Sequence, residues 1–402
     1  MEGLEPLYLD HAATSPPLPE ALAAFAEAAR TAWANPGSLH RAGADATRAL
    51  ERARAEILRA LGAEGYRLVF TASGTESNHL GIRGMAAATR RRAERAASGG
   101  RARVLVGAVE HPSSLRVCEA LAETGFAVER LPVDRAGSVR PEALAAQLGP
   151  DVALVSVHWA NNEIGTLNPI ADLVAATRRA APHAAFHCDA VQAAGKRCEP
   201  LSSLGADTIA VAAHKLGGVR GCAALLVREA GRMPVPDLMG GGQEGGLRSG
   251  TENVMGAAAF AAAARWRADL LRREPRAFAA RRARLLEALR ARMPDLVEVG
   301  EPREAQTLGS ILAVAVPGAR ARTFLTALES EGVLIGSGSA CHGSGTAVSP
   351  VLEAIGLEPG LRNSVLRLSL HGTESDADLA RAAEACATVR ARLAASPAGR
   401  GA

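Results

Sequence analysis

Residues 207–218 read DTIAVAAHKLGG, an apolar run followed by a lysine and a glycine-rich turn. The run Thr208 to Ala212 is typical of a buried strand, and ligands of open α/β sheets bind at the carboxyl ends of strands. Lys215 follows this strand closely, and Lys196 is the only other lysine in the sequence. A lysine whose amine is desolvated can form a Schiff base. Lys215 is therefore either a cofactor lysine or a surface residue, and its neighbours decide between the two.

Similar short apolar runs lie on both sides of this stretch, and helix-length segments separate most of them. Such alternation is typical of an α/β fold with a mostly parallel sheet and helices on both faces. Helices are expected at Ala21 to Arg30 and Ala44 to Leu61. The expected strands are Arg67 to Thr71, Arg103 to Val109, Ala127 to Pro132, Val152 to His158, Ala184 to Asp189, Thr208 to Ala212 and Ala223 to Val227.

The pattern changes after Gly250, where a long helical stretch runs from Val254 to Arg292. A strand-like run, Ser310 to Val316, and a further α+β stretch follow it. The length of 402 residues also favours more than one structural unit. We therefore expect a large domain over residues 14–257 and a smaller α+β domain made of residues 1–13 and 258–402.

A second polar site follows the neighbouring strand, in AAFHCDAVQ (184–192). If the two strands are adjacent, Asp189 and Lys215 lie at the same edge of the sheet. A carboxylate beside a pyridine nitrogen keeps it protonated, while a lysine carries the aldehyde carbon of such a cofactor. Gln192 could donate to the ring hydroxyl. The alternative for Asp189 is an N-cap of the following segment.

The segment FTASGTES (70–77) passes from a strand through Gly74 into a helix that begins near Thr75. Backbone N–H groups and the dipole at a helix N-terminus favour anions, so this junction suits a phosphate. Ser73 with Glu76 could equally form only a capping box. By contrast, GGGQEG (240–245) matches GxGxxG but follows no strand, so we interpret it as a flexible loop and not as a dinucleotide site.

Cys341 lies in GSGSACHGSGTAVSP (336–350), a glycine- and serine-rich segment that predicts an exposed loop. A thiolate there can attack a sulfur atom and carry it as a persulfide. The alternative is a partly buried cysteine in a turn, and His342 could assist proton transfer or face solvent. The other cysteines lie in apolar or helical contexts, namely Cys118, Cys188, Cys198, Cys222 and Cys386.

Composition excludes several classes of protein. The formal net charge of +4 is spread without a long run of like charge, which argues against a nucleic-acid arm. No apolar stretch approaches the roughly 18 residues of a membrane span, and the N-terminus lacks a signal-peptide pattern, so we expect a soluble, cytoplasmic protein. Without CxxC pairs, neither a disulfide framework nor a metal site is predicted.

These motifs together resemble the NifS/IscS-type cysteine desulfurases of the class V aminotransferase group, which are fold-type I pyridoxal-phosphate enzymes, and the related selenocysteine lyases. The resemblance runs through nearly the whole chain. It rests on YLDHAATSP at Tyr8, NPGSLHRAG at Asn35, SGTESN at Ser73, EHPS at Glu110, NNEIG at Asn161, DAVQ at Asp189, HK at His214, GGGQEGGLRSGTEN at Gly240, GSACH at Gly338 and LRLSL at Leu366.

The resemblance implies a fold-type I transferase whose large domain has a mostly parallel seven-stranded sheet and whose small domain carries the catalytic cysteine loop. It implies pyridoxal 5'-phosphate as cofactor, with Lys215 as its Schiff-base lysine and proton carrier and His111 stacked on its ring. It also implies that Asp189 and Gln192 contact the ring. Gly74, Thr75 and His214 hold the phosphate.

The resemblance also implies the substrate contacts and the assembly. Asn162 lies between the cofactor hydroxyl and the substrate carboxylate, which Arg367 binds. Thr251 reaches the phosphate of a neighbouring subunit, so a homodimer is expected. Cys341 receives sulfur from L-cysteine, leaving L-alanine, and passes it to an acceptor protein. Iron–sulfur scaffold, thiolated tRNA, thiocofactor and selenophosphate pathways all fit this chemistry.

The sequence also departs from the family pattern. Ala212 replaces a common phosphate-binding serine, His11 replaces a common asparagine, and HGTE at His371 replaces the usual GRxT. The segment around Cys341 resembles the selenocysteine-lyase form about as well as the desulfurase form. We expect a cysteine desulfurase, with a selenocysteine lyase, or a class V aminotransferase or lyase that does not use Cys341, as alternatives.

Overall fold

The computed structural model describes residues 5–96, 101–300, 306–337 and 349–395. Its larger sheet has the strand order β2-β8-β7-β6-β5-β3-β4. Strands β7, β6, β5, β3 and β4 are mutually parallel, and β8 is antiparallel to both β7 and β2. The bounds are β2 Tyr66–Thr71, β3 Arg103–Gly107, β4 Ala127–Leu131, β5 Val152–Ser156, β6 Ala185–Asp189, β7 Thr208–Ala212 and β8 Ala223–Arg228. The prediction of a mostly parallel seven-stranded sheet is confirmed.

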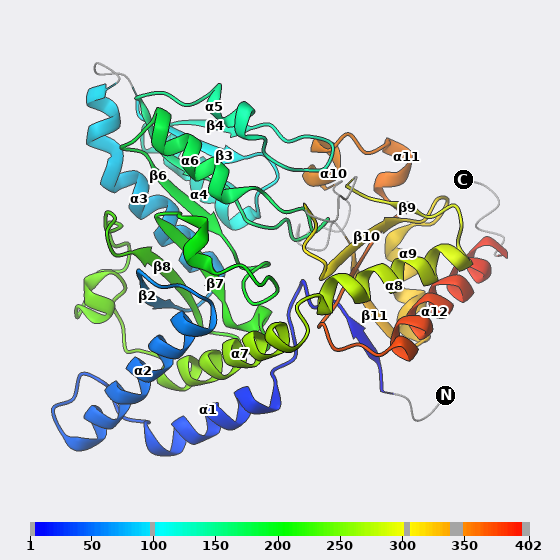
Figure 1. Cartoon of the computed structure of the whole chain (residues 1–402), viewed down its shortest axis with the longest axis horizontal. Helices are drawn as coiled ribbons and strands as arrows, with labels where there is room; N and C mark the ends of the chain where they lie inside the picture. The colour runs from blue at the N-terminus through cyan, green and yellow to red at the C-terminus, as the bar shows by residue number, and fades with distance from the viewer. Residues whose placement is uncertain (1–4, 97–100, 301–305, 338–348, 396–402) are drawn as a thin grey trace.

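Helices cover both faces of this sheet (Figure 1). Alternate residues of a strand face opposite sides, and β6 illustrates this: Phe186 and Cys188 belong to the core cluster shared with α2 and α7, while Ala185 joins a cluster with α3 and α4. The helices are α1 Pro19–Thr31, α2 Arg41–Ala60, α3 Gly74–Ala96, α4 Pro112–Glu123, α5 Pro141–Ala145, α6 Ile170–Ala180 and α7 Val254–Arg273.

A second sheet has the order β1-β11-β12-β10-β9. Its first strand comes from the N-terminus, because β1 pairs in parallel with β11. Helices α8, α9 and α12 pack on it around a separate core cluster, and this part lies beside the larger sheet (Figure 1). The bounds are β1 Leu7–Leu9, β9 Val297–Glu298, β10 Ile311–Ala315, β11 Val333–Ser337, β12 Val365–Ser369, α8 Ala277–Arg292, α9 Ala321–Ser330, α10 Pro350–Ala354, α11 Pro359–Arg362 and α12 Asp376–Ala395.

The expected helical stretch from Val254 to Arg292 is two helices. Helix α7 ends at Arg273 and α8 begins at Ala277. Pro275 lies between them, and a proline lacks the N–H that would continue a helix and restricts the residue before it. The expected domain boundary after residue 257 falls inside α7, and the division into domains stays a prediction.

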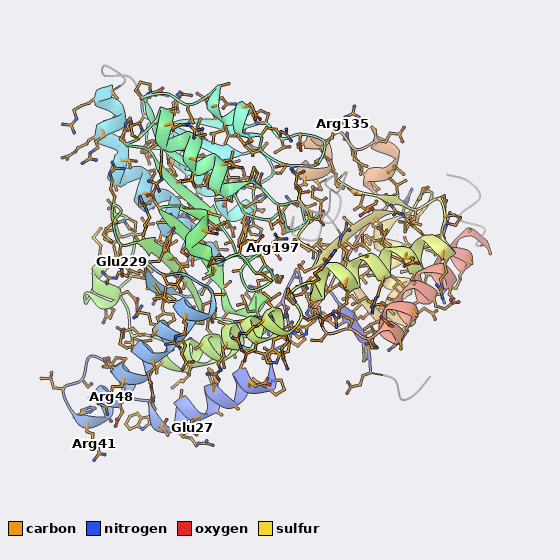
Figure 2. All side chains as sticks on the ribbon, viewed as in Figure 1. Glu27, Arg41, Arg48, Arg135, Arg197 and Glu229 are labelled. Atoms are coloured by element: carbon orange, nitrogen blue, oxygen red, sulfur yellow. The ribbon has the colours of Figure 1, made fainter. Side chains whose placement is uncertain are left out.

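Most charged side chains of α1 and α2 lie at the surface, and Arg54, whose side chain is 18% exposed, is the exception. Glu27, Arg41 and Arg48 point away from the two helices (Figure 2) and are exposed. Arg48 pairs with Asp45 one helical turn earlier on the same helix. Within the described part of the chain, none of the helices combines the length and apolar character needed to span a membrane.

Candidate functional site

A cavity of about 300 Å³ opens where β5, β6 and β7 end and α3 and α4 begin. Most of the residues singled out from the sequence meet there. Its lining comprises Ala12, Ala13, Ser73, Gly74, Thr75, Asn78, His111, Ser113, His158, Ala160, Asn162, Asp189, Val191, Gln192, His214 and Lys215. Segments far apart in the sequence therefore form one polar site at the carboxyl edge of the sheet, as expected for this architecture.

Lys215 enters the cavity from a short 3₁₀ turn, Ala213–Lys215, directly after β7. Its Nζ donates to the carbonyl oxygens of Ala12, at 2.5 Å, and Ala13, at 2.7 Å. The chain then turns at Gly217, whose φ of 96° favours glycine. A Cβ at Gly217 would also lie 2.7 Å from Cγ of Leu18. Close packing against the N-terminal segment thus fixes the backbone that carries Lys215.

Asp189 is the last residue of β6, which pairs in parallel with β7. Its Oδ2 accepts from Nδ2 of Asn78 at 2.7 Å, and its Oδ1 accepts from the backbone N–H of Val191 at 2.9 Å. The second bond closes a local turn, and no regular helix follows, so Asp189 does not cap a helix. Asp189 and Lys215 reach the same cavity from adjacent strands, which confirms the predicted juxtaposition.

His111 caps the N-terminus of α4 and lines the cavity beside Asp189. Its Nδ1 lies 2.7 Å from Oγ of Ser113 and 3.1 Å from the backbone nitrogen of Ser113. Burial lowers the pKa of His111, and the charge of Asp189 opposes that shift in part. A neutral imidazole at this place presents a flat, largely apolar face to the cavity.

The junction between β2 and α3 has the predicted capping contacts and also borders the cavity. Oγ of Ser73 accepts from the N–H of Glu76 at 3.1 Å, while Glu76 accepts from the N–H of Ala72 at 2.8 Å, so a capping arrangement is present. Gly74 and Thr75 nevertheless line the cavity. The helix N-terminus therefore faces the cavity, where an anion is favoured.

His214 lies beside the same cavity. Its Nδ1 is 3.0 Å from the hydroxyl of Thr14, and burial is the main reason why its pKa falls to about 4. Ala212, in place of the common serine, ends β7 and is completely buried. With its pKa lowered in this way, His214 is neutral at neutral pH in this structure.

Gln192 and Asn162 connect the cavity to the smaller sheet. Nε2 of Gln192 donates to the carbonyl of Ala12 at 2.9 Å, while its buried Oε1 has no partner within the described part of the chain. The carbonyl of Asn162 accepts from Nη1 of Arg367 at 3.0 Å. Arg367 is 1% exposed, and its Nη2 lies 2.8 Å from Oδ1 of Asp10. Arg367 therefore lies behind Asn162 and is not among the residues that line the cavity.

Three further predicted residues are absent from the described lining of the cavity. Thr251 is exposed on the segment that precedes α7 and does not line the cavity. Cys341 and His342 lie outside the described residues. The first described residue after them is Ser349, whose Oγ is 2.6 Å from Oε2 of the buried Glu163. Burial raises the pKa of Glu163 to about 7, although Ser349 and the charge of Arg367 counteract the shift.

Sequence reasoning missed His158 and its partner Glu110. Oε1 of Glu110 accepts from the backbone N–H of His158 at 2.6 Å and lies 2.9 Å from Nδ1 of the same residue. Burial alone would lower the pKa of His158, but the charge and hydrogen bond of Glu110 outweigh it and raise that pKa. The only signals were the acidic residue in EHPS and a histidine at the end of an expected strand.

Comparisons with known proteins agree with this geometry. A family model described as aminotransferase class V matches residues 7–381. An IscS-like cysteine desulfurase of Mycobacterium tuberculosis is 39% identical over 394 residues, which cover 96% of this chain and 98% of that protein. A solved NifS-like protein has a TM-score of 0.85 at 26% identity, covering 96% of this chain and 100% of that one. The structure of SspA in complex with cysteine has a TM-score of 0.76 at 27% identity, with coverages of 92% and 100%.

Proposed function

Because the chain belongs to the class V aminotransferase family, we propose that it is a pyridoxal-phosphate-dependent cysteine desulfurase. In this proposal the protein removes sulfur from L-cysteine, forms L-alanine and carries the sulfur as a persulfide on Cys341. The observation that carries the proposal is the meeting of Lys215 and Asp189 in one cavity from adjacent parallel strands. An amine and a carboxylate in that arrangement match the two ends of a pyridoxal ring. The names of similar proteins, including a desulfurase and a cysteine complex, support the substrate.

The residues present fit pyridoxal phosphate. The N-terminus of α3 at Gly74 and Thr75 suits its phosphate, and the carboxylate of Asp189, held by two donors, suits its ring nitrogen. Oε1 of Gln192 is a buried acceptor that has no hydrogen-bond partner among the described residues. Such orphaned groups are uncommon, and a hydroxyl of the bound cofactor would satisfy this one.

When bound, this cofactor supplies an aldehyde carbon that bonds to an amine and a protonated ring that accepts electrons. The protein supplies the rest. Asp189 holds the proton on the ring nitrogen, and Asn78 fixes the direction of that carboxylate. Lys215 holds the cofactor and, once its amine is released, moves the α-proton of the substrate. The carbonyl oxygens of Ala12 and Ala13 accept hydrogen bonds from that amine when it is free.

The substrate is held by groups at the border of the two sheets. Arg367 is the proposed partner of the carboxylate, although in this structure its Nη1 donates to the carbonyl of Asn162, its Nη2 donates to Asp10 and it does not line the cavity. Substrate binding therefore requires these two bonds to be exchanged for bonds to the carboxylate. The Cys341 thiolate then attacks the substrate sulfur, so an S–S bond forms while the carbon–sulfur bond breaks. The remaining three-carbon skeleton takes up a proton and leaves as alanine, and the persulfide is passed to an acceptor.

Assembly and location are part of the same proposal. We infer a homodimer in which Thr251, exposed on one subunit, completes the phosphate site of the other. A cytoplasmic location and a protein acceptor for the sulfur remain predictions from the sequence. Selenocysteine lyase activity is the alternative, since the same residues would act on L-selenocysteine.

The direct test is to reduce the protein with borohydride after incubation with pyridoxal phosphate. Reduction fixes a Schiff base, and mass spectrometry of the digested protein then identifies the modified lysine. We expect the modification on Lys215, and none at this position in Lys215→Ala. Modification of Lys196 with Lys215 untouched would contradict the proposed site.

A further inference from the structure

Glu244, in the segment GGGQEGGLRSGTEN (240–253), has an unusual backbone conformation. Its φ of 51° and ψ of 33° are left-handed, and among the described residues it is the only one other than glycine with a positive φ. An L-residue with a side chain adopts this conformation only at an energetic cost, whereas glycine adopts it freely. Glycine flanks Glu244 on its C-terminal side. A glutamate at this one position therefore points to a role for its side chain.

The Glu244 side chain is buried and forms a fork-to-fork ion pair with an arginine of α2. Oε2 accepts from Nη1 of Arg54 at 2.8 Å, and Oε1 accepts from Nη2 at 3.0 Å. The side chain is 3% exposed. Oε2 also accepts from the backbone N–H of Phe70 at 3.1 Å, and the carbonyl of Glu244 accepts from Nη2 of Arg67 at 3.0 Å. Glu244 thus ties its segment to β2 just before the turn at Gly74.

A second ion pair ties the same segment to the start of α3. Nε of Arg248 lies 2.7 Å from Oε1 of Glu76, whose other oxygen caps that helix. Within the segment, Oε1 of Gln243 accepts from the N–H of Gly250 at 3.0 Å. The next residue, Thr251, is exposed. The segment, whose first part was predicted to be a flexible loop, is therefore held to β2 at Arg67 and Phe70 and to α3 at Glu76, and Thr251 on it is exposed.

We propose that Glu244 is a positioning residue that holds Thr251 in place for the cofactor phosphate of a second copy of this chain. The inference rests on the proposed cofactor and homodimer. Its physical basis is that a hydroxyl on a mobile loop contributes little binding free energy, because the loop must first be ordered. The bidentate, buried pair with Arg54 removes that freedom.

Hybrid dimers distinguish this role from a role in the subunit's own site. One subunit carries Lys215→Ala and cannot form the Schiff base, so the absorption band of the cofactor reports only the intact site of the other subunit. That intact site receives Thr251 from the Lys215→Ala subunit. Glu244→Gln is then placed on either subunit, and the dissociation constant for pyridoxal phosphate is measured from the band.

We expect Glu244→Gln on the Lys215→Ala subunit to weaken cofactor binding at the partner's intact site by roughly tenfold, the loss typical of one charge-assisted hydrogen bond. Arg54→Lys, which keeps the charge and loses the fork, should act in the same direction if Glu244→Gln folds poorly. Glu51→Gln is the matched control, because Glu51 also pairs with Arg54 but is exposed and lies on the same helix. It should leave binding unchanged.

An effect seen only when Glu244→Gln shares a subunit with the intact Lys215 would overturn the inference, since the residue would then act within its own site. Unchanged binding in both arrangements would overturn it as well. A parent hybrid that is dimeric but shows no Schiff-base band contradicts the proposed cofactor instead. A monomeric parent would overturn the homodimer and this inference together.

Discussion

Nδ2 of Asn78 lies 2.7 Å from Oδ2 of Asp189, inside the protein and at the edge of the cavity. The same Nδ2 donates to Ser113, and Oδ1 of Asn78 lies 3.1 Å from Nε2 of His187. One amide therefore orients the carboxylate and links α3, α4 and β6. The precision of the site thus depends on a residue that contributes no charge.

Replacing Asn78 with alanine should destabilise the fold and loosen Asp189. The change leaves buried partners without hydrogen bonds, which costs about 1–3 kcal/mol, and urea unfolding measures it. The cofactor band should also change in position or pH dependence, because Asp189 is less firmly held. Asn363, which follows the end of α11 and does not line the cavity, provides the control asparagine. Asn363→Ala should leave the band unchanged, and an equal change in both variants would contradict a specific role.

The pair formed by Glu110 and His158 should be costly to break. Glu110→Gln removes the buried carboxylate that accepts from the backbone N–H of His158 and faces its imidazole, and leaving a buried polar group without its partner costs about 1–3 kcal/mol. Urea unfolding at neutral pH measures the loss. Replacing both residues, as Glu110→Gln with His158→Phe, should cost less than the sum of the two single changes. Additive losses would contradict a coupled pair.

Gly74 should resist any side chain. A Cβ at this position would lie 2.9 Å from Cγ2 of Val191, a stiff, branched side chain. Gly74→Ala should therefore shift the start of α3 and weaken binding of pyridoxal phosphate by roughly tenfold. Combining it with Val191→Ala removes the clash and should restore part of the affinity. A combined variant no better than Gly74→Ala would contradict the steric explanation.

Glu163 should make stability depend on pH. Its pKa is raised by burial from 4.5 to about 7, so the folded protein keeps a proton that the unfolded chain has already lost. The stability that this proton contributes is fully present below the pKa of Glu163 in the unfolded chain. It is lost as the pH rises through the pKa of Glu163 in the folded protein. The shift corresponds to about 3 kcal/mol between pH 4.5 and pH 7. The unfolding free energy of Glu163→Gln, measured against the wild type across this range, should lack that loss, and parallel pH profiles would contradict the assignment.

Much of the fold could be predicted because the central strands are short apolar runs, and helix-length segments separate most of them along the sequence. The end of β6 at Asp189 and the position of Lys215 after β7 follow from the same pattern. Pro275 indicates the break between α7 and α8, but the alanine-, arginine- and leucine-rich sequence on both sides of it favoured one continuous helix.

Other features depend on contacts that a linear pattern does not contain. Glu110 meets His158 because β3 and β5 are neighbours in the sheet, and Arg367 reaches Asn162 across the border of the two sheets. The left-handed Glu244 is stabilised by Arg54, 190 positions earlier in the chain. The first two contacts follow from strand order and register, and the third follows from how a loop packs on a helix. Sequence periodicity alone fixes none of these arrangements.

The central claim is that Cys341 accepts sulfur from a substrate activated at Lys215. Formation of alanine, sulfide and selenide from L-cysteine and from L-selenocysteine tests it in the wild type, in Cys341→Ala and in Cys198→Ala, an exposed-cysteine control. We predict that the wild type and Cys198→Ala form alanine from L-cysteine, and that Cys341→Ala retains the cofactor band but loses this activity. Unchanged alanine formation from L-cysteine in Cys341→Ala would contradict the claim, and turnover of L-selenocysteine alone would identify a selenocysteine lyase instead.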